Sequence, residues 1–206
     1  MSTSGKLAVC LALLAALAFI VVSLRRISAP VWLSVAIALA MRVLFAAVTS
    51  KHYTPNDVTT YFHHAGQIVL NGGDPLIHLP GRQWNFLQLM PYIFALEIKT
   101  GWAWVYAVKI APILCDVLIV WLISRLAIDA PASRALQYAV NPLSLFVVSL
   151  HGQVEPVALA LALVALLLIR RDRWLFAGIF IGAAIAAKTW PILIALAFFP
   201  LTRARR

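Results

Sequence analysis

The chain has 206 residues, of which 63% are hydrophobic and only 12% are charged, and its mean hydropathy is +0.93. A soluble domain is about 45–50% apolar and about 25% charged, so this composition excludes a soluble enzyme. It also excludes a disordered chain, which requires low hydrophobicity. The class that remains is an all-α, polytopic membrane protein. Both cysteines, Cys10 and Cys115, fall in apolar runs and indicate neither a disulfide framework nor a metal cluster.

Apolar runs predict about seven transmembrane helices in a single membrane domain, residues 1–206, because each crossing needs about 20 residues. In chain order the runs cover 7–24, 31–49, 102–124, 135–150, 155–169, 174–187 and 190–201. The first run is not typical of a signal peptide, because no small-residue cleavage site follows it and Arg25 and Arg26 lie behind it.

Basic residues are concentrated in alternate connections between these runs. Those connections hold Arg25, Arg26, Arg125, Arg134, Arg170, Arg171, Arg173, Arg203, Arg205 and Arg206. Basic loops stay in the cytoplasm, so we expect the N-terminus outside and the C-terminus inside. Topology thus explains where the net charge of +10 lies. Nucleic-acid binding has no support, because no aromatic residues alternate with the basic ones.

One connection, residues 50–101, is too long for a simple link between helices and is predicted to be an extracytoplasmic loop with interfacial helices. A proline and a capping-type residue signal a helix start, and apolar residues at helical spacing predict an amphipathic helix over 57–70. The Gly- and Pro-containing turn 71–75 ends it. A second segment, 84–98, suits an interfacial helix because polar residues interrupt it.

Titratable and polar side chains gather on the predicted outer side, which indicates an extracytoplasmic site. Asp57 either caps the helix that starts there or acts as a general base, which requires a carboxylate at the membrane surface near cations. Asp57, Tyr61 and His64 share one helix face at this spacing. No metal is expected, because the adjacent His63 and His64 diverge by about 100° on a helix and no H-E-x-x-H pattern occurs.

The predicted outer turn 151–156 contains more polar residues than a turn requires. Its glycine and proline explain the bend, but His151, Gln153 and Glu155 do not, and we expect them to contribute to substrate binding. In the next outer turn, Lys188 either extends its charge to the membrane surface or contacts a phosphate.

Three charged residues fall inside apolar runs, where each costs about 2.5–3.5 kcal/mol on insertion scales. They are Arg42, Lys109 and Asp116. One interpretation is a buried ion pair between helices. The other is a cationic pocket for the phosphate head group of a lipid.

Four stretches together resemble the polytopic GT-C glycosyltransferases, above all the bacterial enzymes that use polyprenyl-phosphate mannose and the related eukaryotic lipid-linked-sugar enzymes. The stretches are Asp57-Val-Thr-Thr-Tyr61 with the turn 71–75, Lys109-Ile-Ala-Pro112-Ile-Leu-Cys-Asp116, Asn141-Pro142 with the turn 151–156, and Lys188-Thr-Trp-Pro191. The resemblance covers residues 40–202.

This resemblance implies transfer of a hexose, with mannose as the expected sugar, from a polyprenyl-phosphate donor to an extracytoplasmic glycan, lipid or protein acceptor. It implies inversion without a cofactor, in a bacterial inner membrane and among its lipids. The family's catalytic aspartate matches Asp57, and a phosphate leaving group needs cations more than an acid. The candidate cations are Arg42, Arg82, Lys109 and Lys188.

Family members have more spans than this chain, so a second polypeptide is expected to complete the fold, or the chain is truncated or inactive. Two other functions stay open at this point. One is a non-catalytic membrane scaffold or subunit with the same fold, and the other is a lipid or solute transporter.

Overall fold

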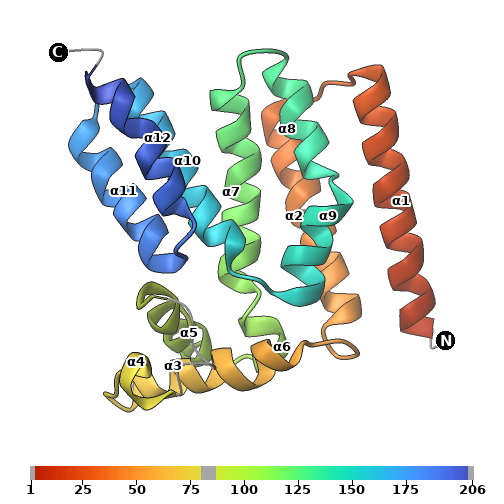
Figure 1. Cartoon of the computed structure of the whole chain (residues 1–206). Coiled ribbons are helices and arrows are strands. Elements are labelled where there is room, and N and C mark those ends of the chain that lie inside the picture. Colours follow the sequence, from red (N-terminus) through yellow and green to blue (C-terminus); the bar gives the residue numbers. More distant parts are fainter. Residues whose placement is uncertain (1–2, 80–86, 204–206) are drawn as a thin grey trace.

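The computed structural model describes residues 3–79 and 87–203, with side chains up to residue 197. Seven helical stretches run side by side as a bundle, and each matches one apolar run of the sequence (Figure 1). They are α1 (Thr3–Arg25), α2 (Val31–Thr49), α6 (Trp104–Ala107) with α7 (Ile110–Leu126), α8 (Pro131–Ala139) with α9 (Pro142–Leu145) and η2 (Phe146–His151), α10 (Glu155–Arg170), α11 (Trp174–Ala187) and α12 (Pro191–Arg203).

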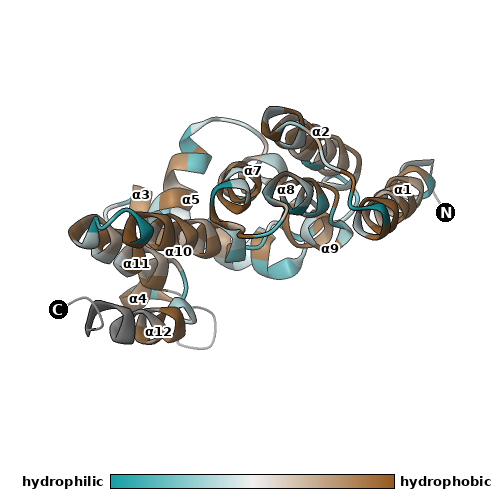
Figure 2. Cartoon of the chain, turned by 90° about the horizontal axis from the view of Figure 1, so that it is seen from above, coloured by the Kyte–Doolittle hydropathy of each residue, from teal (hydrophilic) through white to brown (hydrophobic). Residues whose placement is uncertain are grey.

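Three stretches are long and apolar enough to cross a membrane, namely Thr3–Arg25, Val31–Thr49 and Trp104–Leu126. By contrast, α10 and α11 have 16 and 14 residues, fewer than the roughly 20 of a typical crossing. The all-helical class is therefore confirmed for the described residues, whereas seven crossings stay a proposal. In the view from above, hydrophobic residues dominate the helices and hydrophilic ones gather largely in turns (Figure 2).

A layer of shorter helices lies across one end of the bundle (Figure 1). It contains η1 (Asp57–Phe62), α3 (His63–Leu70), α4 (Pro75–His78) and α5 (Leu89–Lys99), and we call it the end layer. Within it α3 packs closely on α5, and the ring of Phe62 at the end of η1 stacks on Phe94 of α5 with centroids 4.8 Å apart. Gly66 permits this contact, because a Cβ there would lie 3.0 Å from the main chain of Phe94.

Most of the described arginines lie in or next to the turns at the other end of the bundle. Figure 1 shows the connections 26–30, 127–130 and 171–173 at the end opposite the end layer, with the N-terminus on the side of the end layer. The orientation in the membrane that the distribution of basic residues predicts, with this end in the cytoplasm, stays a prediction.

The run 135–150, expected as one continuous helix, is broken. α8 ends at Ala139, α9 starts at Pro142, and η2 continues as π-helix. Proline lacks an N–H and its ring blocks continuation of the preceding turn. Asn141 caps the new helix by accepting the N–H of Leu143 at 2.9 Å. The break leaves carbonyl groups at the end of α8 that need other donors.

Candidate functional site

Asp57 meets the turn between η2 and α10 at the end of the bundle that the end layer covers. Gln153 Nε2 donates to Asp57 Oδ2 at 3.4 Å, and His151 Nε2 lies 3.9 Å from Asp57 Oδ1. The two polar residues of the turn also contact each other, with 3.2 Å between Gln153 Nε2 and His151 Nε2. The Asp57 and His151 side chains are 36% and 30% exposed, so both remain accessible to a substrate. We call this group the Asp57 cluster.

Local backbone structure explains how these side chains are presented. Asp57 is the first residue of the π-helical segment η1, and His151 is the last residue of the π-helical segment η2. Single π-helical turns are rare and occur frequently at functional sites. The next residue, Gly152, has a φ of +87°, a conformation that glycine adopts without strain. This turn directs His151 and Gln153 toward the end layer.

Trp104 fixes the start of the end layer relative to the bundle. Its indole Nε1 donates to the carbonyl of Val58 at 2.7 Å, one residue from Asp57. The His63 ring lies against the same indole, with centroids 5.0 Å apart. Burial, and then the neighbouring His64, lower the pKa of His63. The aspartate therefore sits on a backbone held by a specific side-chain hydrogen bond.

A second charged pair lies beside the Asp57 cluster. Lys188 Nζ, from the turn between α11 and α12, lies 2.8 Å from Oε1 of Glu155 at the start of α10. The Lys188 side chain is 23% exposed and that of Glu155 is 40% exposed. Among the described residues, Glu155 Oε2 has no hydrogen-bond partner although the atom itself is buried.

A cavity of about 200 Å³ lies beneath this second pair. Glu155 and Trp190 line it together with Asp116, Tyr138 and Ser144. Polar groups from α7 and the broken helix thus share one cavity with a carboxylate of the candidate site.

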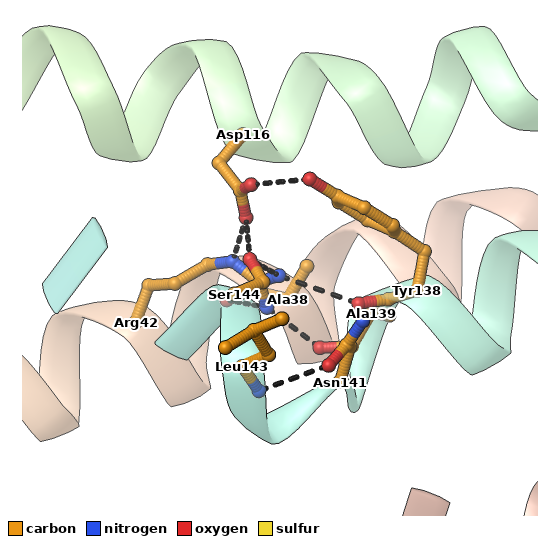
Figure 3. Close-up of polar contacts among 8 residues, drawn as sticks. All are labelled: Ala38, Arg42, Asp116, Tyr138, Ala139, Asn141, Leu143 and Ser144. Carbon is orange, nitrogen blue, oxygen red and sulfur yellow. Dashed lines mark hydrogen bonds and ion pairs between the residues drawn. The ribbon is translucent and has the colours of Figure 1, made fainter. Parts of the chain in front are cut away.

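Arg42 lies in the interior, where α2, α7 and the broken helix meet (Figure 3). The residue is fully buried and forms an ion pair with Asp116. It also donates to the carbonyl of Ala139 at 2.6 Å and to Ser144 Oγ at 2.9 Å. Asp116 additionally accepts from Tyr138 Oη and Ser144 Oγ, each at 2.7 Å. The interpretation as a buried pair between helices is confirmed for Arg42 and Asp116.

This geometry connects Arg42 to the helix break. Pro142 prevents α8 from continuing, and the freed carbonyls of Tyr138 and Ala139 accept hydrogen bonds from the guanidinium at 3.4 and 2.6 Å. Inside a membrane such carbonyls need a protein donor, because no water is available to them.

Lys109 has a comparable position next to the turn 151–153. The residue is 1% exposed, and its Nζ donates to Ser50 Oγ at 2.7 Å and to the carbonyls of Ser149 and Leu150 at 2.6 and 3.0 Å. A lysine ammonium has three donors, so these contacts use all of them. Lys109 thereby holds the end of η2, and its stem packs behind Gly152.

Tyr61, His64 and Arg82 are the remaining residues that the sequence predicts for the site. Tyr61 is half-buried and packs against the core between the end layer and the bundle, and His64 is exposed. The segment that carries Asp57 and Tyr61 is π-helical, with more residues per turn than an α-helix, and the common face of Asp57, Tyr61 and His64 stays a prediction. Arg82 lies outside the described residues.

Sequence reasoning missed the role of Glu97. This residue is 4% exposed, and its Oε1 accepts the N–H of Ala111 in the first turn of α7 at 2.9 Å. Oε2 has no hydrogen-bond partner among the described residues, and burial raises the pKa of Glu97 to about 8. The carboxyl thus joins α5 of the end layer to the start of α7. Its only sequence signal was an acid in an otherwise apolar segment.

Comparison with known proteins identifies a family. The family model described as Glycosyltransferase family 87 matches residues 86–206, more than half of the chain, and the chain therefore belongs to this family. Neither a curated protein nor a solved structure matches the chain. The match includes Lys109, His151, Gln153, Glu155 and Lys188, whereas Asp57 precedes it. Membership indicates a membrane protein with glycosyltransferase activity.

Proposed function

We propose that this member of glycosyltransferase family 87 transfers a hexose, mannose in the first instance, from a polyprenyl-phosphate sugar to an extracytoplasmic acceptor with inversion. Asp57 is the general base, and the bundle, with seven crossings and a GT-C-like architecture, holds the site at the outer membrane surface. The observation that carries the proposal is the convergence of Asp57, His151 and Gln153 from two distant parts of the chain.

Asp57 has the surroundings that a base for a sugar hydroxyl requires. Its Oδ1 accepts the N–H of Val58 at 2.9 Å, and Gln153 donates to Oδ2. These two hydrogen bonds fix the direction of the carboxylate. In the proposed step Asp57 takes the proton of the acceptor hydroxyl. That oxygen attacks the anomeric carbon from the face opposite the phosphate, and the bond between sugar and phosphate breaks with its electron pair on the phosphate.

A cation is needed where the negative charge of the phosphate develops. Lys188 is the best-placed described candidate, since its Nζ contacts Glu155 next to the turn that carries His151 and Gln153, and its side chain is partly exposed. In this proposal Arg42 and Lys109 hold broken backbone instead, because carbonyl and hydroxyl oxygens occupy their donors. Arg82 stays a second candidate for the phosphate, and Glu155 and His151 orient the sugar or the acceptor.

An apolar groove supports a donor linked to lipid. The groove, of about 520 Å³, lies between α2 and the α6–α7 unit and is lined by residues such as Leu39, Val43, Trp102 and Ile113. Lys109 also lines it, and the same side chain packs against Gly152 of the turn that carries His151. A polyprenyl chain in this groove would end near the Asp57 cluster.

The donor class is tested with the purified full chain and a panel of donors. Polyprenyl-phosphate mannose, other polyprenyl-phosphate hexoses and nucleotide sugars are each incubated with membrane acceptors, with and without membrane extract. We expect transfer from a polyprenyl-phosphate sugar. Transfer from nucleotide sugars alone would contradict the donor class, and activity only with extract would support a second polypeptide. No transfer under any condition would favour a scaffold.

The role of Asp57 is tested with a matched pair of variants. Asp57→Asn removes the base, and we expect it to lower the rate by at least about 10²-fold, within the usual contribution of general base catalysis. The control is Asp74→Asn, because Asp74 belongs to the same end layer but caps α4 through the N–H of Leu76. If Asp57→Asn is as active as Asp74→Asn and the unchanged chain, Asp57 is excluded as the base.

A further inference from the structure

A polar cavity lies at the end of the bundle opposite the Asp57 cluster. Its volume is about 540 Å³, and it lies between the end of α1 and the start of α8, beside the turn 127–130. Its lining comprises Ser23, Arg26, Asp129, Ala130, Ser133, Arg134 and Gln137. No step of the proposed glycosyl transfer uses these residues.

The charges in this cavity do not neutralise one another by direct pairing. Among the described residues, no ion pair within 4.0 Å joins Asp129 to Arg26 or Arg134. The guanidinium of Arg134 has one side-chain partner, Gln137, at 3.3 Å. Two guanidinium groups and one carboxylate leave a net charge of +1, which matches the single negative charge of a phosphodiester.

A buried hydroxyl and a helix terminus add donors at the same place. Ser133 is 4% exposed, and its Oγ has no hydrogen-bond partner among the described residues. A buried hydroxyl without a partner is costly, so it marks a position where a ligand oxygen would be favourable. Ala130 and Ser133 both line the cavity, so the N-terminus of α8 adjoins it. Helix N-termini attract anions.

We propose that this cavity binds the phosphodiester head group of an anionic phospholipid. The lipid source follows from α1 and the turn after it, which expose large apolar side chains beside the cavity. Ile20, Leu24 and Ile27 are 51%, 80% and 39% exposed within a few residues of Arg26, and acyl chains can cover them. Basic pockets between transmembrane helices on the cytoplasmic side are known to bind such head groups. This proposal does not depend on glycosyl transfer.

Lipid binding is measured by native mass spectrometry of the full chain in neutral detergent, titrated with phosphatidylglycerol or phosphatidylcholine. We expect preference for phosphatidylglycerol. Arg26→Gln with Arg134→Gln should weaken phosphatidylglycerol binding by roughly tenfold or more, because each basic group near the surface attracts anionic lipid. The matched control, Arg171→Gln with Arg173→Gln, removes the same charge from an exposed turn at the same end and should change binding by less than about threefold.

Equal weakening by both double variants would overturn the proposal, because it would show general attraction to a basic surface. Equal affinity for both lipids would also overturn it. If millimolar inorganic phosphate displaces phosphatidylglycerol, the ligand of the cavity is a soluble anion and the proposal of a lipid is wrong. If Arg26→Gln with Arg134→Gln loses its helical circular dichroism, Ser133→Ala is the variant that tests the site. It should lower phosphatidylglycerol binding without changing the unfolding temperature, and unchanged binding would contradict the site.

Discussion

Removing the guanidinium of Arg42 should destabilise the bundle more than any change at an exposed arginine. Arg42→Met keeps an unbranched side chain but leaves Asp116 as a buried charge without its cation. Breaking a buried pair from one side costs about 3–5 kcal/mol. The carbonyl of Ala139 also loses its donor, and an unsatisfied buried carbonyl costs about 1–3 kcal/mol. We therefore expect a total loss of roughly 4–8 kcal/mol.

The assay is unfolding of the purified chain in mixed micelles with increasing SDS, followed by circular dichroism. Arg125→Met is the control, since Arg125 is exposed in the last turn of α7, and it should change the free energy of unfolding by less than about 0.5 kcal/mol. The double variant Arg42→Met with Asp116→Leu removes both charges, so its loss should be smaller than the sum of the single losses by about 0.5–3 kcal/mol. A loss below about 1 kcal/mol for Arg42→Met, or strict additivity, would refute this account of the helix break.

Three further changes test the end layer and the site. Because burial raises the pKa of Glu97 to about 8 from 4.5, the folded chain retains a proton that the unfolded chain releases, and stability should fall as pH rises between these values. Glu97→Gln should flatten this decline in a denaturation series, and an unchanged slope would contradict the assignment. Trp104→Phe removes the donor to Val58 and should lower kcat more than it changes the donor KM, whereas a purely structural role would lower only the amount of folded protein. Lys188→Gln should raise the donor KM. The control Lys99→Gln, at an exposed position in the end layer, should leave the donor KM unchanged. Equal KM values for the two variants would argue against Lys188 as the phosphate ligand.

Hydrophobic runs were sufficient to place the helices. The expected runs 31–49 and 174–187 coincide with α2 and α11, and the amphipathic segment 57–70 is helical throughout. These elements are determined by local periodicity, which a sequence displays directly. The break inside 135–150 was not expected although Pro142 is visible in the sequence. Whether a proline ends or only kinks a membrane helix depends on which neighbouring donors reach the freed carbonyls, and here the donor is Arg42, about a hundred residues away in the chain.

The candidate site was only partly accessible from the sequence for the same reason. Proximity along the chain predicted that His151 and Gln153 share a turn, and the sidedness of the loops placed Asp57 on the same face of the membrane. The π-helical form of η1 was not predictable from spacing. Hydrogen-bond geometry assigns Lys109 to backbone carbonyls, a contact that no periodic pattern encodes.

The proposed function requires the Asp57 cluster and Lys188 to face the outside of the cell, where a lipid-linked sugar and its acceptor can meet. Its most direct test uses Cys10→Ala and Cys115→Ala as background, with single substitutions Asn56→Cys, Thr189→Cys or Arg171→Cys at exposed positions. Each variant is treated with a membrane-impermeant maleimide in sealed right-side-out vesicles. The account predicts labelling at positions 56 and 189 in intact vesicles and at position 171 only after permeabilisation. Labelling of position 171 with protection of position 56 would contradict it.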